Sequence, residues 1–146
     1  MTIAFYSKTE SYNEFSNFAL FGVEMDDRWY PTIEHYFQAM KFPGNDHAEK
    51  IRLARTPASA KSLGRSRKVK LREDWEEVKI DIMRDAVLKK FTTHDELREL
   101  LLSTTDQELV ENAPGDYFWG CGKSGSGKNW LGKILMEVRD QLKQRE

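Results

Sequence analysis

Residues 29–42 read Trp29-Tyr-Pro-Thr-Ile-Glu-His-Tyr-Phe-Gln-Ala-Met-Lys-Phe42, and this stretch decides the fold of the chain. Its apolar side chains Ile33, Phe37 and Met40 recur at positions i, i+4 and i+7. That spacing places them on one face and predicts an amphipathic helix anchored in a hydrophobic core. Thr32, or the proline before it, can start this helix, and the Pro-Gly pair that follows the stretch ends it.

The polar side chains of the same helix carry its chemistry. Glu34, Gln38 and Lys41 also follow the i, i+4, i+7 spacing and therefore share a face. A carboxylate and an amine on one face, surrounded by aromatic residues, are what acid–base or imine chemistry needs. The alternative is a solvated polar stripe, in which the attraction between Glu34 and Lys41 contributes only roughly 0.2–0.5 kcal/mol.

The composition indicates one domain, residues 1–146, and a chain of this length buries roughly 68–70% of its unfolded surface. Charged residues make up 32% and balance to a net charge of −1, which argues against a general polyanion binder but allows local patches. The single cysteine, Cys121, excludes an internal disulfide framework and suits a reducing compartment. No signal-peptide run is present and no window approaches roughly 18 apolar residues, so we expect a cytoplasmic protein without a membrane partner.

The remaining periodicity and turn residues predict an α+β fold, a helix-rich domain with a small β-sheet. Thr56-Pro57 is a typical helix start, Gly64 a typical helix end, and Thr93-His-Asp-Glu96 a capping box. The segments expected to be extended are 3–6, 19–25 with a turn at Asp26-Asp27, 108–112 and 117–119. The further segments expected to be helical are 47–55, 58–63, about 73–91, one ending at 102 and one beginning at 129.

A basic segment runs from Ala58 to Arg72 without an acidic residue. Arginine binds phosphate through two parallel hydrogen bonds, so a substrate phosphate would find partners there. A solvated loop and helix face is the alternative. The cations of the segment are Lys61, Arg65, Arg67, Lys68, Lys70 and Arg72.

A glycine-rich segment reads Trp119-Gly-Cys-Gly-Lys-Ser-Gly-Ser-Gly-Lys-Asn-Trp130. It matches a phosphate-binding Walker A loop as far as Lys128 and then fails, because Asn129 replaces the hydroxyl residue that would hold magnesium. Only 18 residues follow Lys128, too few for the parallel βα units of a nucleotide-binding fold. The glycines instead predict a loop whose backbone N–H groups, with Lys123 or Lys128, approach a ligand, or else a plain surface turn.

Other polar residues have both a functional and a structural interpretation. Asp116 can place a second carboxylate beside a stacking platform formed by Trp119, although Trp119 can equally belong to the core. Asn17, between two phenylalanines, can contact a base or a sugar or simply form a turn. No histidine–asparagine pattern supports Cys121 as a nucleophile. The three histidines and the cysteine lack metal-ligand spacing, so we expect no metal and no cofactor.

Several of these motifs occur together, in the same order, in one known family. The chain resembles the NADAR family, in particular its bacterial YbiA-like members, from about Phe5 to the C-terminus. The helix block and the late tryptophan- and glycine-rich block are specific in combination. The motifs are Ser16-Asn-Phe18, Trp29-x-x-Thr-x-Glu-His-Tyr-Phe-Gln-Ala-x-Lys-Phe42, Ala60-Lys-x-Leu-Gly-Arg65, Asp116-x-x-Trp-Gly120 and Gly127-Lys-Asn-x-Leu-Gly132.

The resemblance implies an N-glycosidase. YbiA-like proteins cleave the bond between the ribosyl carbon and the amine of early riboflavin-pathway intermediates, the 5-amino-6-ribosylamino-pyrimidine phosphates. The products are ribose 5-phosphate and a pyrimidine. Other family members act on ADP-ribose attached to guanine bases.

The resemblance also implies roles for the candidate residues. Glu34 is the candidate that activates water or protonates the leaving nitrogen, and Lys41 the candidate that captures the ring-opened sugar as an imine. Asp116 would position water or bind ribose hydroxyls. The candidates for substrate binding are Asn17, Trp29, Gln38, Arg65, Trp119, Lys128 and Asn129.

Two alternatives remain beside the riboflavin intermediate, which would be a small-molecule partner. One is an ADP-ribosyl-guanine hydrolase acting on modified nucleic acid, for which a flipped or single-stranded base needs little surface. The other is a non-catalytic module that binds ADP-ribose or a nucleotide without turnover. Nothing in the sequence indicates an obligatory protein partner, and we expect activity to survive a chelator.

Overall fold

The helix predicted after Thr32 forms as α1 (Ile33–Ala39). The Thr32 side chain accepts a hydrogen bond from the backbone N–H of His35 at 3.1 Å, which caps the helix. The structure is a computed structural model that describes residues 1–145. Its other elements are β1 (Thr2–Phe5), η1 (Asn13–Phe15, a 3-10 helix), β2 (Val23–Met25), β3 (Arg28–Tyr30), α2 (Asp46–Arg52), α3 (Pro57–Arg65), α4 (Trp75–Thr93), α5 (Asp95–Ser103), β4 (Glu108–Glu111) and α6 (Trp130–Gln144).

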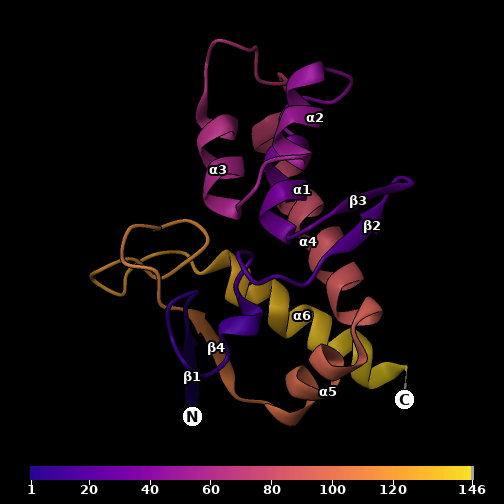
Figure 1. Cartoon of the computed structure of the whole chain (residues 1–146). Coiled ribbons are helices and arrows are strands. Elements are labelled where there is room, and N and C mark those ends of the chain that lie inside the picture. The colour runs from indigo at the N-terminus through magenta and orange to yellow at the C-terminus, as the bar shows by residue number, and fades with distance from the viewer. Residues whose placement is uncertain (146) are drawn as a thin grey trace.

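The strands form two separate two-stranded sheets in place of the one small sheet expected. β2 and β3 pair as the antiparallel hairpin predicted around Asp26-Asp27. β1 and β4 pair in parallel, with Phe5 opposite Glu111, and Figure 1 shows them side by side near the N-terminus. A parallel pair needs a long crossover connection, and five of the helices lie in the chain between these two strands.

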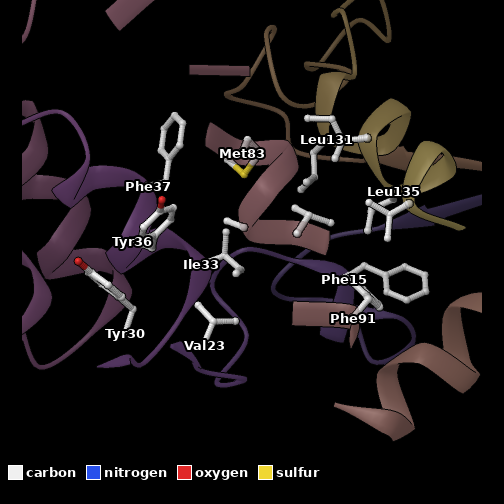
Figure 2. Packing of buried hydrophobic residues seen from close by; sticks show 14 of the residues in the cluster. Phe15, Val23, Tyr30, Ile33, Tyr36, Phe37, Met83, Phe91, Leu131 and Leu135 are labelled. Atoms are coloured by element: carbon white, nitrogen blue, oxygen red, sulfur yellow. The ribbon is translucent and has the colours of Figure 1, made fainter. Parts of the chain in front are cut away.

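The long helix α4 is the centre of the packing. It contacts α1, α5 and α6, and Figure 1 shows α6 crossing beside it. In Figure 2, apolar side chains from α1, α4 and α6 gather in one core. The labelled members from these helices include Ile33, Phe37, Met83, Phe91, Leu131 and Leu135. None of the helices within residues 1–145 is long and apolar enough to cross a membrane.

Two predicted helix boundaries were wrong, both because of contacts with distant residues. The helix α3 continues through Gly64, where a Cβ would lie 1.9 Å from Oε1 of Gln38, so the glycine permits close packing of α1 against α3. Thr93 is the last residue of α4 rather than the cap of α5. The intervening His94 makes no side-chain cap; its Nε2 instead lies 2.7 Å from the Gly22 carbonyl oxygen.

Candidate active site

A cavity of about 810 Å³ is the site around which the predicted catalytic residues gather. Its walls come from α1, α3 and α4, from the segments that follow β1 and η1, and from β4 with the loop after it. This size is typical of a pocket for a small organic ligand. Seven of the ten predicted site residues line it, namely Asn17, Glu34, Gln38, Lys41, Arg65, Asp116 and Trp119.

The polar face of α1 points into this cavity and is not a solvated stripe. Glu34, Gln38 and Lys41 are 7%, 4% and 8% exposed. Ile33 and Phe37 on the same helix are buried in the core, so both faces of α1 are covered. Gln38 Nε2 donates a hydrogen bond to Glu34 Oε2 at 2.6 Å, which orients the carboxylate. Within residues 1–145, the one hydrogen bond of Lys41 Nζ is long, 3.5 Å, to the Gly64 carbonyl.

Burial shifts Glu34 of α1, and Lys41 just after that helix, toward their neutral forms. It raises the pKa of Glu34, against the hydrogen bond from Gln38 and the nearby cations Lys61 and Lys41. Burial, together with the positive charge of Arg67, lowers the pKa of Lys41 to about 8 against the attraction of Glu34. An appreciable fraction of Lys41 is therefore an uncharged amine near neutral pH, which is the nucleophilic form.

Aromatic rings form one wall of the cavity. Phe37 contacts the ring of Trp75 with centroids 5.0 Å apart and the ring of Trp119 edge-on at 5.3 Å. Trp119 also packs edge-to-face against Phe118 at 4.8 Å. Lys41 Nζ lies 5.8 Å from the Trp75 ring centroid. Such a wall can stack on a planar heterocycle, which contributes roughly 1–3 kcal/mol per base in comparable sites.

The loop after β4 is shaped by Asp116. Its Oδ1 accepts hydrogen bonds from the backbone N–H groups of Phe118 and Trp119, at 3.0 and 2.8 Å. Residues 117–119 are consequently bent, and the predicted extended segment there was wrong. Asp116 thus has a structural task, and it also lines the cavity beside Trp119.

Asn17 enters the cavity from the segment after η1. Its carbonyl accepts the backbone N–H of Glu34 at 3.1 Å, which ties this segment to the start of α1. Its side chain is 8% exposed, and within residues 1–145 its Oδ1 has no hydrogen-bond partner. A buried amide oxygen without a partner is costly, so this atom fits a ligand's hydroxyl or amine donor.

Three predicted binding residues do not line the cavity. Trp29 lies on β3, is 53% exposed, and covers Gly22, where a Cβ would lie 2.1 Å from the indole. Lys128 is exposed, and its Nζ lies 5.7 Å from the outer aromatic ring of Phe118. Their placement gives these two residues no contact with a ligand in the cavity.

Asn129, the third of these residues, binds the backbone of β4, the strand that carries Glu111 of the cavity wall. Its Nδ2 donates to the Leu109 carbonyl at 3.0 Å, and its Oδ1 accepts the backbone N–H of Glu111 at 2.9 Å. Its φ of 54° is in the left-handed region, which asparagine tolerates better than most residues. The side chain therefore fastens α6 to β4 and has no free polar atom for a ribose.

The sequence interpretation missed Glu111, which lines the cavity from the end of β4. Burial, together with the negative charges of Asp116 and Glu34, raises the pKa of Glu111 to about 8. A signal was present, because side chains alternate along a strand and Glu111 follows the core residue Leu109 by two positions. Trp75, Lys79 and Lys8 also line the cavity without having been singled out as ligand contacts, and so does Lys61 of the basic segment. Residues 1–145 contain no group of three or more histidine, cysteine or acidic side chains placed to hold a metal ion.

The chain is similar to several known proteins over almost its whole length. N-glycosidase Npun_R5314 of Nostoc punctiforme is 51% identical over 146 residues, which cover 98% of this chain and 94% of that protein. N-glycosidase YbiA of Escherichia coli is 48% identical over 140 residues, which cover 96% of this chain and 88% of that protein. The chloroplastic riboflavin biosynthesis protein PYRR of Zea mays is 40% identical over 155 residues, which cover 96% of this chain but 25% of that protein.

The fold agrees with these similarities. The NMR structure of Escherichia coli YbiA matches with a TM-score of 0.91 and 46% identity, over 99% of this chain and 86% of that one. The model of the NADAR domain matches residues 4–143. With this match, and with two N-glycosidases that are similar over 94% and 88% of their own lengths, the chain belongs to the NADAR domain family.

Proposed function

We propose that this N-glycosidase hydrolyses the ribosyl C–N bond of early riboflavin-pathway intermediates, the 5-amino-6-ribosylamino-pyrimidine 5'-phosphates, and releases ribose 5-phosphate. The observation that carries the proposal is the placement of Glu34 on α1 and of Lys41 just after the end of that helix, both buried and both lining one cavity. The names of the relatives support it, because two are N-glycosidases and the maize protein is a riboflavin biosynthesis protein.

The cavity offers a place for each part of such a substrate. The pyrimidine would stack on the aromatic wall of Phe37, Trp75 and Trp119. The 5'-phosphate would bind among cationic side chains, and the ribose would lie between them, within reach of Glu34. The cations available along the cavity, besides Lys41, are Lys8, Lys61, Arg65 and Lys79.

Lys41 is the proposed nucleophile. A ribosylamine ring-opens readily, which exposes C1 as an imine carbon, and the uncharged amine of Lys41 can add to it and expel the pyrimidine amine. Hydrolysis of the resulting lysine imine releases the sugar and restores the amine. The lowered pKa and the single long hydrogen bond of Lys41 favour this route over a purely electrostatic role.

Glu34 is the proposed carboxylate partner. Positive charge develops at C1 when the C–N bond breaks, and a nearby carboxylate stabilises it. The hydrogen bond from Gln38 holds Glu34 in one orientation and favours its ionised form. In its ionised form Glu34 can also take a proton from the adding amine or from water.

The direct test is release of ribose 5-phosphate from the ribosylamino-pyrimidine phosphate in EDTA. Glu34→Gln and Lys41→Ala should each abolish turnover. Matched controls are Glu24→Gln and Lys50→Ala, because both residues are exposed and away from the cavity. Full activity in Glu34→Gln and Lys41→Ala would refute the assigned roles.

The same assay separates the alternatives. If wild type leaves this compound intact, the riboflavin proposal fails, and ADP-ribosylated guanine becomes the substrate to test. Tight binding of ADP-ribose with no turnover of either compound, unchanged by Glu34→Gln, would identify a binding module instead.

A further inference from the structure

Glu111 is a buried carboxyl group that the mechanism above leaves without a task. It is 8% exposed and lines the cavity at the end of β4. Its backbone is held on both sides, because its N–H donates to Asn129 Oδ1 and its carbonyl accepts the N–H of Cys121, each at 2.9 Å. Within residues 1–145, however, its carboxyl group has no hydrogen-bond partner and no ion pair. Such a fixed but unpartnered buried group is suited to act on a ligand.

The surroundings of Glu111 and Glu34 differ in a way that assigns the proton. Glu34 receives a hydrogen bond from Gln38 and is attracted by Lys61 and Lys41. Glu111 faces the carboxylates of Asp116 and Glu34, and Lys61 is the one cation that opposes its protonation appreciably. When two carboxyl groups share a site, the group without donors keeps the proton. Burial raises the pKa of both carboxyl groups, and at Glu111 the negative charges of Asp116 and Glu34 act in the same direction and bring its pKa to about 8.

We propose that Glu111 is the general acid of the reaction and gives its carboxyl proton to the leaving amine nitrogen as the C–N bond breaks. This inference rests on the proposed function, in which that nitrogen leaves as an amine. Glu34 and Lys41 alone provide no proton donor for the leaving nitrogen, because Glu34 is needed in its ionised form when the C–N bond breaks. Glu111 provides that donor.

The atoms balance in the imine route. The Lys41 nitrogen forms a bond to C1, and one of its protons passes through the Glu34 carboxylate to the pyrimidine nitrogen, which receives the electron pair of the C1=N double bond. The bond from C1 to the pyrimidine nitrogen then breaks, its electron pair stays on that nitrogen, and the nitrogen takes the proton of Glu111 and leaves as an amine, with a protonated imine left on Lys41. Water next adds its hydroxyl to C1 and gives its other proton to the Glu111 carboxylate. The proton of this new hydroxyl passes through Glu34 to the Lys41 nitrogen as the bond from C1 to Lys41 breaks, which releases the sugar as an aldehyde.

The proposal predicts a particular pH profile. Lys41 must be deprotonated and Glu111 protonated, so the rate should rise and then fall around pH 8. The charged groups that face Glu111 are Glu34 on α1, Lys61 on α3 and Asp116 on the loop, and Lys8 lines the same cavity from the segment after β1. Glu111→Gln keeps the volume and the neutral charge of the protonated acid but cannot lose a proton. In this variant the rate should no longer fall above about pH 8.

The kinetic test compares Glu111→Gln with Glu108→Gln, a control on the same strand whose side chain is exposed. In Glu111→Gln we expect kcat to fall at least about a hundredfold, the usual contribution of a general acid, with KM within about threefold of wild type. Glu108→Gln should behave as wild type. A Glu111→Gln enzyme with wild-type kcat, or one that retains the falling limb, overturns the proposal.

A second measurement needs no substrate and therefore does not depend on the proposed function. Infrared spectra at pH 7 should show the C=O stretch of a protonated, buried carboxyl group in wild type and in Glu108→Gln, and its loss in Glu111→Gln. Identical carboxyl bands in all three proteins overturn the proposal. If wild type proves inactive on the ribosylamine, the substrate assignment fails while this spectrum still decides whether Glu111 holds a proton.

Discussion

The chain buries two lysines that differ in what their side-chain nitrogens contact. Lys90 of α4 is 1% exposed, and its Nζ donates to the carbonyls of Glu14 and Ser16 at 2.6 and 3.0 Å. Lys41, after the end of α1, is 8% exposed, lines the cavity and has one contact at 3.5 Å. Burial lowers both pKa values, to about 7 for Lys90 and about 8 for Lys41.

The difference shows that a lowered pKa alone does not identify a reactive lysine. Lys90 donates its hydrogen bonds to backbone carbonyls, and those bonds hold the segment that brings Asn17 to the cavity. Lys41 keeps its donor capacity and has open space in front of it. Free hydrogen-bonding capacity beside a cavity is therefore the feature that separates the proposed nucleophile from a structural lysine.

The largest expected effect is on activity, from Lys41→Arg. The guanidinium keeps the positive charge but cannot form an imine, so kcat should fall at least about a thousandfold. Release of ribose 5-phosphate measures it, with Lys50→Arg on the exposed side of α2 as the control. An active Lys41→Arg enzyme would show that Lys41 acts through its charge alone. The proposed distinction between a nucleophilic Lys41 and a structural Lys90 would then be wrong.

The next effect is on stability, from Lys90→Met. Two buried carbonyls would lose their donor, which should lower the free energy of unfolding by about 2–4 kcal/mol. Urea unfolding measures the change, and Lys89→Met, an exposed neighbour on α4, should stay within about 0.5 kcal/mol of wild type. A Lys90→Met protein as stable as wild type would show that these bonds do not hold the fold.

Lys41→Met should raise the free energy of unfolding, in contrast to Lys90→Met. Between pH 8 and pH 10.5 the unfolded chain binds a proton at Lys41 that the folded chain does not, so this residue makes wild-type stability rise with pH in that window. Below pH 8 the folded protein bears the full cost of a buried charge, and Lys41→Met should gain roughly 1–3 kcal/mol at pH 7.

Urea unfolding at pH 7 and pH 10 checks this prediction. The gain of Lys41→Met over wild type should shrink as the pH rises toward 10.5. A variant that is less stable than wild type at both pH values would place Lys41 with Lys90 among the structural lysines.

A smaller effect is expected from Gly64→Ala, which disturbs the surroundings of Lys41 and leaves Lys90 untouched. The new Cβ would meet Gln38, the residue that orients Glu34. We expect kcat to fall about tenfold and stability by about 1–3 kcal/mol, as for other overpacked sites. Ser62→Ala, exposed on the same helix, is the control, and equal kinetics for the two variants would count against the role of Gln38.

The smallest effect is expected from EDTA. The imine route uses amine and carboxyl groups alone, so turnover by wild type should be unchanged after prolonged dialysis against the chelator. A loss of activity that added divalent metal restores would contradict the mechanism proposed for Lys41 and Glu34.

Local sequence signals were sufficient for α1 and for the hairpin. Thr32 caps the helix as expected, and the spacing placed Glu34, Gln38 and Lys41 on one face, which the structure confirms. Whether that face was solvated could not be predicted from spacing, because its burial depends on α3 and on the loop after β4. Packing between segments distant in the sequence determines whether this face is exposed to solvent, and a short stretch of sequence does not contain that information.

The same limitation explains the errors at other positions. Gly64 looks like a helix end because its partner, Gln38, is 26 positions earlier in the chain. Asn129 looks like a ligand residue, whereas its side-chain amide forms hydrogen bonds with the backbone of β4. In each case the partner of the side chain is distant in sequence.

Borohydride trapping tests the central claim, the imine on Lys41, most directly. Wild type and Lys90→Met would be mixed with the ribosylamino-pyrimidine phosphate, reduced during turnover, digested and analysed by mass spectrometry. One reduced sugar-phosphate adduct on Lys41 is the predicted result for both, with none in Lys41→Arg. Turnover without an adduct, or an adduct on another lysine, would contradict the assignment.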